Sequence, residues 1–295
     1  MQIQAANYII GFGVDYYSTL SQLINDKKYS KIVLLVDENT AQHCLNYVLQ
    51  WLAVDVTFEI IEIEQGEENK TVETCTAVWE SLVELNIDRK ALLINVGGGM
   101  VCDLGGFVAS TYKRGIDFMN IPTSLLAMVD ASVGTKTGVN LGGLKNMIGS
   151  FSQPQMVLID TAFLETLPGN QMRSGLAEMF KHGLIADASY WNQLKNLGEL
   201  TTEDLLLLIY HSVSIKNEIV LQDPFEENVR KLLNFGHTLG HVIETYSHSG
   251  KGIQPLLHGE AVAIGIILEA FISYKKDLLT KNSYSSYCKT REIVI

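Results

Sequence analysis

Three histidines in two short segments have the residue types and spacing of a metal site. His237 and His241 lie in the run Asn234-Phe-Gly-His-Thr-Leu-Gly-His241, and His258 is the second residue of Leu257-His-Gly-Glu260. Residues four apart share one face of a helix, so His237 and His241 point to the same side. A neutral imidazole is a good zinc ligand, and zinc takes three or four ligands from different parts of a chain. These segments predict a divalent-metal site on packed helices.

A carboxylate would complete such a site and leave one position open for substrate. Glu178, in Ser174-Gly-Leu-Ala-Glu-Met-Phe-Lys181, is the best candidate, and His182 competes with it on the same helical face. Only three protein ligands are needed, so one histidine is spare for acid–base work, and the spacing alone does not say which. The alternative is that each histidine lies in the core and satisfies backbone groups.

A second candidate site is the triple glycine Gly97-Gly98-Gly99, which directly follows an apolar run and precedes Asp103. Glycine lacks the Cβ that would block a phosphate, and the start of the next helix offers free N–H groups. The spacing differs from the Rossmann fingerprint, so an ordinary tight turn is an equal alternative.

Several basic residues lie beside glycine or within apolar runs. Lysine and arginine in such settings are more often placed to bind an anion than to keep a surface soluble, which favours a substrate with phosphate or carboxylate groups. These residues are Arg114, Lys136, Lys145, Lys181, Lys216 and Arg230.

The elements that position these residues change in character along the chain. Short apolar runs predict buried strands at 32–37, 56–63, 91–96, 118–121 and 156–159, and an amphipathic helix is expected over 72–85. Alternating strands and helices indicate an open, Rossmann-like parallel sheet with ligands beyond the strand ends.

From about Ser174 the pattern becomes helical, with helices expected over 203–221, 229–247 and 259–274. Pro168-Gly169 interrupts the pattern near the change. We expect an α/β domain over 1–165 and an all-α domain over 166–295, with the metal residues in the second.

Composition excludes some classes of protein. Apolar residues make up 47% of the 295-residue chain and charged residues 19%, which is typical of a compact globular protein. The net charge of −11 disfavours nucleic-acid binding. The N-terminus lacks the features of a signal peptide, no apolar run has the length of a membrane span, and the four cysteines are far apart. We therefore expect a cytosolic protein with reduced thiols and no nucleic-acid or membrane partner.

Longer motifs in the chain resemble the 3-dehydroquinate synthase family. They are Val96–Gly115, Ile121–Asp130, Gly142–Asn146 and the histidine segments, and the resemblance extends from about Val33 to Ala270. It implies a dehydroquinate-synthase-like fold and a homodimer. It also implies an NAD- and zinc-dependent lyase (EC 4.2.3.4) of the shikimate pathway, with cobalt as an alternative metal. The substrate would be a phosphorylated sugar acid, 3-deoxy-arabino-heptulosonate 7-phosphate, which is converted to 3-dehydroquinate and phosphate.

The resemblance also implies roles for individual residues. Metal ligands correspond to Glu178, His237 and His258, and catalytic residues to Glu226, His241, Lys136 and Arg114. NAD contacts correspond to Asp37, Asn39, Glu67, Lys70, Gly98, Gly99, Met100, Asp103, Thr123, Ser124, Asp130, Lys145, Phe163 and Thr166. Substrate contacts correspond to Arg114, Asp130, Lys136, Lys145, Asn146, Lys181, Lys216, Arg230 and Asn234.

Three alternatives stay open. Another sugar-phosphate cyclase would make an inosose- or valiolone-type ring, and a metal-dependent glycerol dehydrogenase would share the two-domain plan but consume NAD stoichiometrically. An inactive NAD- or metal-binding homologue would be a non-catalytic protein. The sequence after Tyr274 does not match the further helices and basic segment of the family, so we expect a shorter C-terminus than the family norm.

Overall fold

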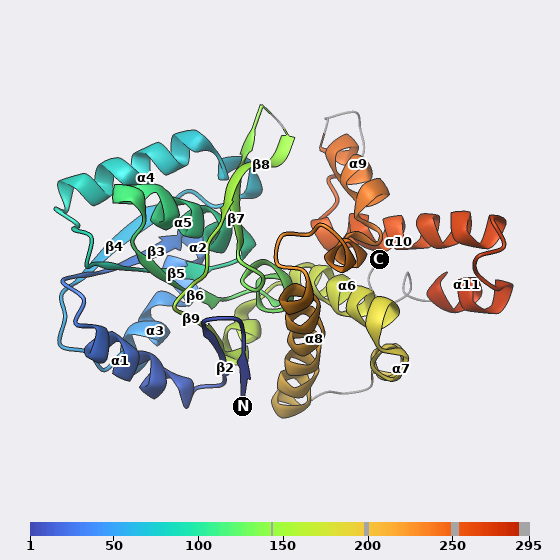
Figure 1. The fold of residues 1–295 in the computed structure, drawn as a ribbon, viewed down its shortest axis with the longest axis horizontal. Helices are drawn as coiled ribbons and strands as arrows, with labels where there is room; N and C mark the ends of the chain where they lie inside the picture. Colours follow the sequence, from blue (N-terminus) through green and yellow to red (C-terminus); the bar gives the residue numbers. More distant parts are fainter. Residues whose placement is uncertain (143, 198–200, 249–253, 289–295) are drawn as a thin grey trace. The chain divides into compact units, whose positions relative to one another are not determined.

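The chain forms two compact units in the computed structural model, which describes residues 1–142, 144–197, 201–248 and 254–288 (Figure 1). The first unit is Met1–Thr166, and the second begins at Leu167. An α/β region is followed by a helical region, as predicted. Gly143, in the motif Gly142–Asn146, and the last seven residues of the C-terminal segment lie outside the described residues.

Within the described residues of the first unit, seven strands form a sheet in the order β1-β2-β9-β6-β5-β3-β4. Only β1 pairs in the antiparallel sense; the other pairs are parallel. The strands are β1 (Gln2–Gln4), β2 (Ile9–Phe12), β3 (Ile32–Asp37), β4 (Phe58–Ile63), β5 (Leu92–Gly97), β6 (Asp117–Pro122) and β9 (Met156–Ile159). All five predicted strands are confirmed, whereas β1 and β2 were not predicted.

Helices cover both faces of this sheet because its central strands are apolar on both sides. On one face lie α4 (Val72–Glu84) and α5 (Gly99–Thr111), and on the other lie α1 (Tyr16–Lys27) and α3 (Leu45–Trp51) (Figure 1). The predicted stripe of α4 is buried at Cys75, Val78 and Leu82. Short elements complete the unit: α2 (Glu38–His43), η1 (Glu67–Asn69), η2 (Tyr112–Arg114), η3 (Ala127–Ala131) and η4 (Thr161–Thr166).

A separate antiparallel hairpin consists of β7 (Lys136–Leu141) and β8 (Leu144–Phe151). The sequence analysis did not predict it, because this stretch is rich in glycine and polar residues. Gly138 and Gly149 face each other where a Cβ on either would meet the backbone of the opposite strand. The hairpin carries Lys136, Lys145 and Asn146.

The second unit is helical throughout its described residues. Its helices are α6 (Gly169–Ala186), α7 (Ala188–Lys195), α8 (Thr202–Gln222), η5 (Val229–Asn234), α9 (His237–Ser247), α10 (His258–Lys275) and α11 (Lys281–Tyr287). Helix α6 packs against α7, α8 and α10, and α9 packs along α10. None of the helices in the described part of the chain is both long and apolar enough to cross a membrane.

The helix predicted over 229–247 is wrong as a single element. It is divided into η5 and α9 at Phe235-Gly236, where Gly236 has φ +82°. A Cβ at Gly236 would meet Ile266 and the Val262 carbonyl of α10, so the left-handed turn and the close approach both require glycine. The break makes His237 the first residue of α9.

Candidate active site

Glu178 is a buried carboxylate at the middle of α6, with none of its surface exposed. Lys181, one turn later and also buried, forms an ion pair with Oε2 of Glu178. Burial alone would raise the pKa of Glu178, but Lys181 and the imidazoles of His237 and His258 hold it well below its usual range. The folded protein therefore holds an ionised carboxylate in its interior.

Two imidazoles point at the other oxygen of this carboxylate. Nε2 of His237 is 3.4 Å from Oε1 of Glu178, and Nε2 of His258 is 3.6 Å from the same atom. The ring of His241 lies 5.2 Å from that of His237 and 5.6 Å from that of His258, measured between centroids. The structure thus brings together all four residues that the sequence analysis singled out.

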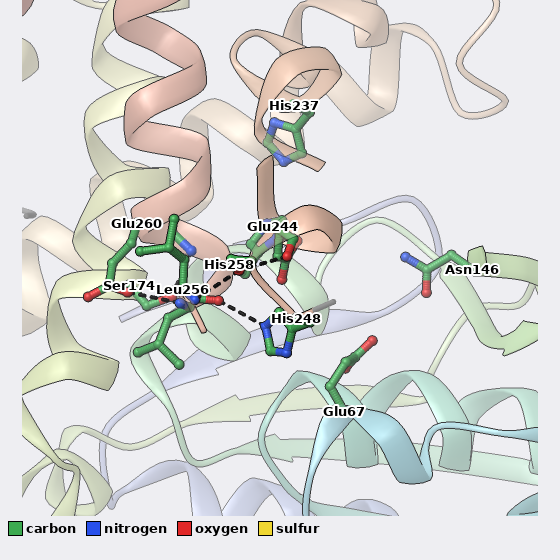
Figure 2. Close-up of polar contacts among 12 residues, drawn as sticks. Glu67, Asn146, Ser174, His237, Glu244, His248, Leu256, His258 and Glu260 are labelled. Carbon is green, nitrogen blue, oxygen red and sulfur yellow. Dashed lines mark hydrogen bonds and ion pairs between the residues drawn. The ribbon is translucent and has the colours of Figure 1, made fainter. Parts of the chain in front are cut away.

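The opposite ring nitrogens of these two histidines face oxygen atoms. Nδ1 of His237 lies 3.3 Å from the carbonyl oxygen of Phe235, and Nδ1 of His258 lies 3.3 Å from Oε2 of Glu244 (Figure 2). An Nδ1–H that donates to such an oxygen leaves the Nε2 lone pair available to a cation. Both rings are held with their ligand atoms toward Glu178.

Close helix packing explains why histidines from two helices converge. A Cβ at Gly265 of α10 would lie 1.9 Å from the carbonyl oxygen of Gly236, and one at Gly240 of α9 would lie 3.1 Å from the carbonyl oxygen of Ala261. A Cβ at Gly259 would lie 2.1 Å from the carbonyl oxygen of Ser174 in α6. The three helix backbones therefore touch at glycines, and the side chains of Glu178, His237 and His258 meet beside these contacts.

The N-terminus of α9 is capped by a carboxylate from α10. Glu269 accepts hydrogen bonds from the backbone N–H of Gly236 at 2.8 Å and of Leu239 at 3.3 Å. Two of the unpaired N–H groups at the helix start are satisfied in this way, and the negative charge suits that end of the helix. Glu269 therefore fixes the position of His237, the first residue of α9.

The residues fit a divalent metal. Oε1 of Glu178 is buried and has no hydrogen-bond partner among the residues that the structure describes, and two Nε2 atoms point toward it. Two histidines and one glutamate form a ligand set of catalytic zinc sites. His182, the competing candidate, bonds through Nδ1 to Oγ of Ser212 at 2.8 Å and so links α6 to α8.

Glu226 and Asn234 are hydrogen-bonded to each other, and Glu226 lies in a loop that Asp223 holds through backbone N–H groups. Nδ2 of Asn234 donates to Oε1 of Glu226 at 2.6 Å. The preceding Asp223 accepts the backbone N–H groups of Glu227, Asn228 and Arg230. One carboxylate therefore shapes the segment that carries Glu226 and Arg230. Lys216 and Arg230 are both buried, on α8 and η5.

In the first unit, the residues predicted for NAD follow the carboxyl ends of the parallel strands. Asp37 ends β3, Gly98 and Gly99 follow β5, and Thr123 and Ser124 follow β6. Most of the remaining members follow in the same way: Asn39 in α2, Glu67 and Lys70 after β4, Met100 and Asp103 in α5, Asp130 in η3, and Phe163 and Thr166 in η4. Lys145 differs, because it lies on strand β8 of the separate hairpin. Carboxyl ends of parallel strands share one sheet edge, where ligands of open α/β sheets bind.

Lys70 connects several of these residues. Its Nζ lies 2.6 Å from Oδ2 of Asp103 and 2.7 Å from Oδ1 of Asn146, and the residue is 3% exposed. Burial would lower the pKa of Lys70, but Asp103 and Glu67 outweigh burial and raise it. Lys70 therefore ties the start of α5 to the β7–β8 hairpin as a charged group.

Arg114 does not lie at the carboxyl edge of the sheet. Helix α5 begins at the carboxyl end of β5 and returns to the amino end of β6, so Arg114, in η2 after α5, lies at the opposite edge of the sheet. Its side chain is exposed.

Sequence reasoning also missed the acidic residues that hold the site together, namely Asp223, Glu244 and Glu269. Glu244 follows His241 by three residues, so the helical spacing carried a signal for it. The partners of Asp223 and Glu269 depend on the loop and on the helix crossing, which spacing does not reveal.

Comparison with known families gives two adjoining matches. The model described as 3-dehydroquinate synthase N-terminal matches residues 60–174, and the model described as 3-dehydroquinate synthase C-terminal matches residues 175–293. A 3-dehydroquinate synthase from Parabacteroides distasonis is 43% identical over 88% of this chain and 74% of its own length. One from Streptococcus pyogenes serotype M3 is 39% identical over 97% of this chain and 79% of its own length.

Solved structures share the fold. A 2-deoxy-scyllo-inosose synthase, solved with carbaglucose-6-phosphate, NAD+ and Co2+, has a TM-score of 0.89 at 25% identity over 100% of this chain and 82% of its own. A 2-epi-5-epi-valiolone synthase from Streptomyces hygroscopicus, solved with NAD+ and Zn2+, has a TM-score of 0.87 at 27% identity. The match covers 99% of this chain and 81% of that one. An NADH-dependent butanol dehydrogenase from Thermotoga maritima has a TM-score of 0.74 at 12% identity, and the match covers 99% of this chain and 83% of that one.

Proposed function

The chain belongs to the 3-dehydroquinate synthase family of carbon–oxygen lyases, and from this premise we propose how its residues divide the work of that reaction. The reaction converts 3-deoxy-arabino-heptulosonate 7-phosphate to 3-dehydroquinate and phosphate. It consists of a transient oxidation, loss of phosphate, reduction, and closure of the ring.

We assign the metal to Glu178, His237 and His258, and we propose that it is zinc. The observation that carries the assignment is the buried Oε1 of Glu178, which lies 3.4 and 3.6 Å from the Nε2 atoms of the two histidines. When bound, the metal would polarise a substrate hydroxyl while NAD accepts and later returns a hydride. Support for both groups comes from the NAD- and metal-bound structures of the two related cyclases.

We assign NAD to the carboxyl edge of the sheet. No side chain among the described residues caps the start of α5 at Gly98, so its first N–H groups are available for a pyrophosphate. Within the described part of the chain, a Cβ at Gly98 would meet one atom, Oγ of Ser124 at 3.5 Å, so the glycine leaves space beside the chain. Asp37 and Asn39 after β3 would face the nucleoside, and Phe163 and Thr166 after β9 would complete the site.

We assign proton transfer to His241 and Glu226. His241 lies next to both proposed imidazole ligands without being needed as a third, so its ring would lie beside a hydroxyl bound to the metal. Glu226, held by Asn234, would exchange a proton during phosphate loss and ring closure.

The residues proposed for the substrate would hold its phosphate and its carboxylate, and the lysines and arginine among them would offset the charge that develops as phosphate leaves. In the first unit these are Lys136, Lys145 and Asn146 of the hairpin, with Asp130 beside them in sequence. In the second unit they are Lys181, Lys216, Arg230 and Asn234. Arg114 lies at the other sheet edge, so its assignment rests on the family motif alone.

The test is phosphate release from the heptulosonate phosphate by purified protein with sub-stoichiometric NAD. We expect many phosphates per NAD, loss of release after chelation, and recovery on adding zinc. One phosphate or fewer per NAD, with NADH accumulating, would indicate a dehydrogenase instead. Repeating the assay with cobalt in place of zinc, at equal metal occupancy, shows which of the two metals gives the higher turnover.

The other sugar-phosphate cyclases are less similar to the chain than the dehydroquinate synthases are. Synthases of the inosose and valiolone types are 25 and 27% identical to it, whereas the 3-dehydroquinate synthases are 39 to 43% identical. The same phosphate assay with glucose 6-phosphate and sedoheptulose 7-phosphate tests them directly. We expect no release from either sugar.

A further inference from the structure

Glu244 is a buried acidic residue beside the proposed metal site, and it is not one of the proposed ligands. It lies in the last turns of α9, is 3% exposed, and places Oε2 3.3 Å from Nδ1 of His258 (Figure 2). Burying a carboxylate costs free energy unless the group is paired, so the contact of Glu244 with the imidazole of His258 indicates that the carboxylate has a function there.

The two nitrogens of the His258 ring face two different carboxylates. Nδ1 faces Glu244, and Nε2 lies 3.6 Å from Oε1 of Glu178 on the opposite side of the ring. An imidazole that donates Nδ1–H to one acceptor presents the Nε2 lone pair to the other side. By contrast, Nδ1 of His237 faces an uncharged backbone carbonyl, that of Phe235.

The helix end that carries Glu244 is fastened to the segment that carries His258. Oγ of Ser247 donates to the carbonyl of Glu244 at 2.7 Å and accepts the backbone N–H of Leu256 at 3.0 Å. Nε2 of His248 lies 3.1 Å from the carbonyl oxygen of Leu256. From the other side, the N–H of Gly259 donates to Oγ of Ser174 in α6 at 2.9 Å. The segments that carry the carboxylate and the imidazole are therefore joined by hydrogen bonds.

We propose that Glu244 is a positioning residue, which accepts Nδ1–H of His258 and so fixes the tautomer and orientation in which Nε2 binds the divalent metal. The proposal rests on the metal site assigned above. It gives Glu244 no contact with metal or substrate: the residue acts through His258, by holding the ring and by making its Nε2 a stronger donor.

The test is the zinc affinity of metal-free protein, measured by competition with a chelator of known affinity, together with the midpoint of urea unfolding of the same metal-free protein. Glu244→Gln keeps the size of the side chain and removes its charge. We expect its zinc affinity to fall roughly 10- to 100-fold, as is usual when such an outer carboxylate is changed. Its unfolding midpoint should match that of the wild type, which a merely structural role would not allow.

The matched control is Glu260→Gln. Glu260 accepts the backbone N–H of Leu257 at 2.8 Å, in the first turn of α10, so this variant removes one negative charge next to His258 without touching its ring. We expect zinc affinity within about twofold of wild type. Wild-type affinity in Glu244→Gln, or an equal loss in both variants, would overturn the proposal.

Two further variants make the result unambiguous. Glu178→Gln removes a proposed metal ligand, so unchanged zinc affinity in it would contradict the metal site itself, whatever Glu244 does. Glu244→Asp keeps the charge and shortens the side chain, and it is the variant to measure if Glu244→Gln does not fold. We expect an affinity between those of wild type and Glu178→Gln; an affinity equal to wild type would contradict the dependence on the Nδ1 contact.

Discussion

At the scale of single residues, Glu178 decides the character of the site. An ionised carboxylate in a protein interior is costly unless cations or hydrogen-bond donors surround it. Here Lys181 neutralises Oε2, and two imidazoles face Oε1. A divalent cation bound at Oε1 would add further positive charge beside the carboxylate, so it would stabilise the fold as well as take part in the reaction.

Lys136 is the residue whose role is most simply tested by truncation. It is exposed at the first position of β7, so Lys136→Ala should leave the fold intact. Loss of a cation that offsets the charge of the departing phosphate should lower kcat roughly 100- to 1000-fold. The measurement is steady-state phosphate release by folded variant, with circular dichroism to check the fold.

The control for this prediction is Lys90→Ala, which removes an exposed lysine before β5. It should keep wild-type turnover. Wild-type turnover in Lys136→Ala as well would refute the assignment of Lys136.

At the scale of elements, the sequence predicted those strands and helices whose apolar pattern fits only one type of secondary structure. The run Ile32–Asp37 is apolar at every position but the last, and it forms the buried parallel strand β3. The predicted apolar stripe over 72–85 is the buried face of α4. The β7–β8 hairpin was missed because Gly138 and Gly149 interrupt any alternation. The break at Gly236 was missed because it depends on contact with α10, which is a tertiary effect.

The crossing of α9 and α10 should not tolerate a methyl group. In Gly265→Ala the new Cβ would lie 1.9 Å from the carbonyl oxygen of Gly236, so the two helices must separate. Overpacking of this kind typically costs about 1–3 kcal/mol, and separation would also move His237 away from His258. Urea unfolding and zinc affinity measure the two effects.

Gly169→Ala is the comparison for Gly265→Ala. Gly169 begins α6, and among the described residues its Cβ position has just one atom within 4 Å, a nitrogen of Arg173 at 3.9 Å. This variant should unfold at the wild-type urea concentration. Equal stability of Gly265→Ala would mean that the helices do not touch as described.

The loop that carries Glu226 should depend on the charge of Asp223. Burial would raise the pKa of Asp223, but its three backbone N–H donors outweigh burial and lower it. Because the folded-state pKa is lowered, the stabilisation is complete above the ordinary carboxyl pKa and is lost as the pH falls through the lowered value. Asp223→Asn should remove this acid dependence.

Hydrogen exchange of the amides of Glu227, Asn228 and Arg230 measures the effect at each donor. In Asp223→Asn we expect smaller protection factors at all three amides at neutral pH, and in the wild type a loss of protection only in acid. Unchanged exchange in the variant would show that the loop is held by other contacts.

At the scale of the whole molecule, the residues proposed for NAD lie in the first unit and the proposed metal ligands lie in the second. The two bound groups should therefore be separable by mutation. Gly98→Ala has room in the protein, with Oγ of Ser124 at 3.5 Å, but its methyl group would occupy the space proposed for pyrophosphate. We expect at least tenfold weaker NAD binding with unchanged zinc stoichiometry, the factor being roughly that of one lost close contact.

Isothermal titration with NAD and elemental analysis of the same sample make this measurement. Gly169→Ala serves again as the comparison. Loss of zinc along with NAD affinity would mean that the two sites are not separable.

The overall plan was accessible from the sequence because two different periodicities follow each other along the chain. Parallel strands give way to long helices near Pro168, and the family motifs place each proposed ligand on a particular element. What the sequence did not reveal are contacts between residues far apart in the chain, such as Glu269 with Gly236 and Ser174 with Gly259. Such pairs depend on the packing of whole helices.

The glycines at the helix contacts have a consequence for engineering. A histidine that binds a metal can be exchanged for another ligand, such as cysteine or aspartate, when a different metal is wanted. Gly259 and Gly265 have no substitute, because a Cβ on either would lie within 2.1 Å of a carbonyl oxygen. A designer who wishes to change the chemistry of this site is therefore free to vary its ligands and must keep its glycines.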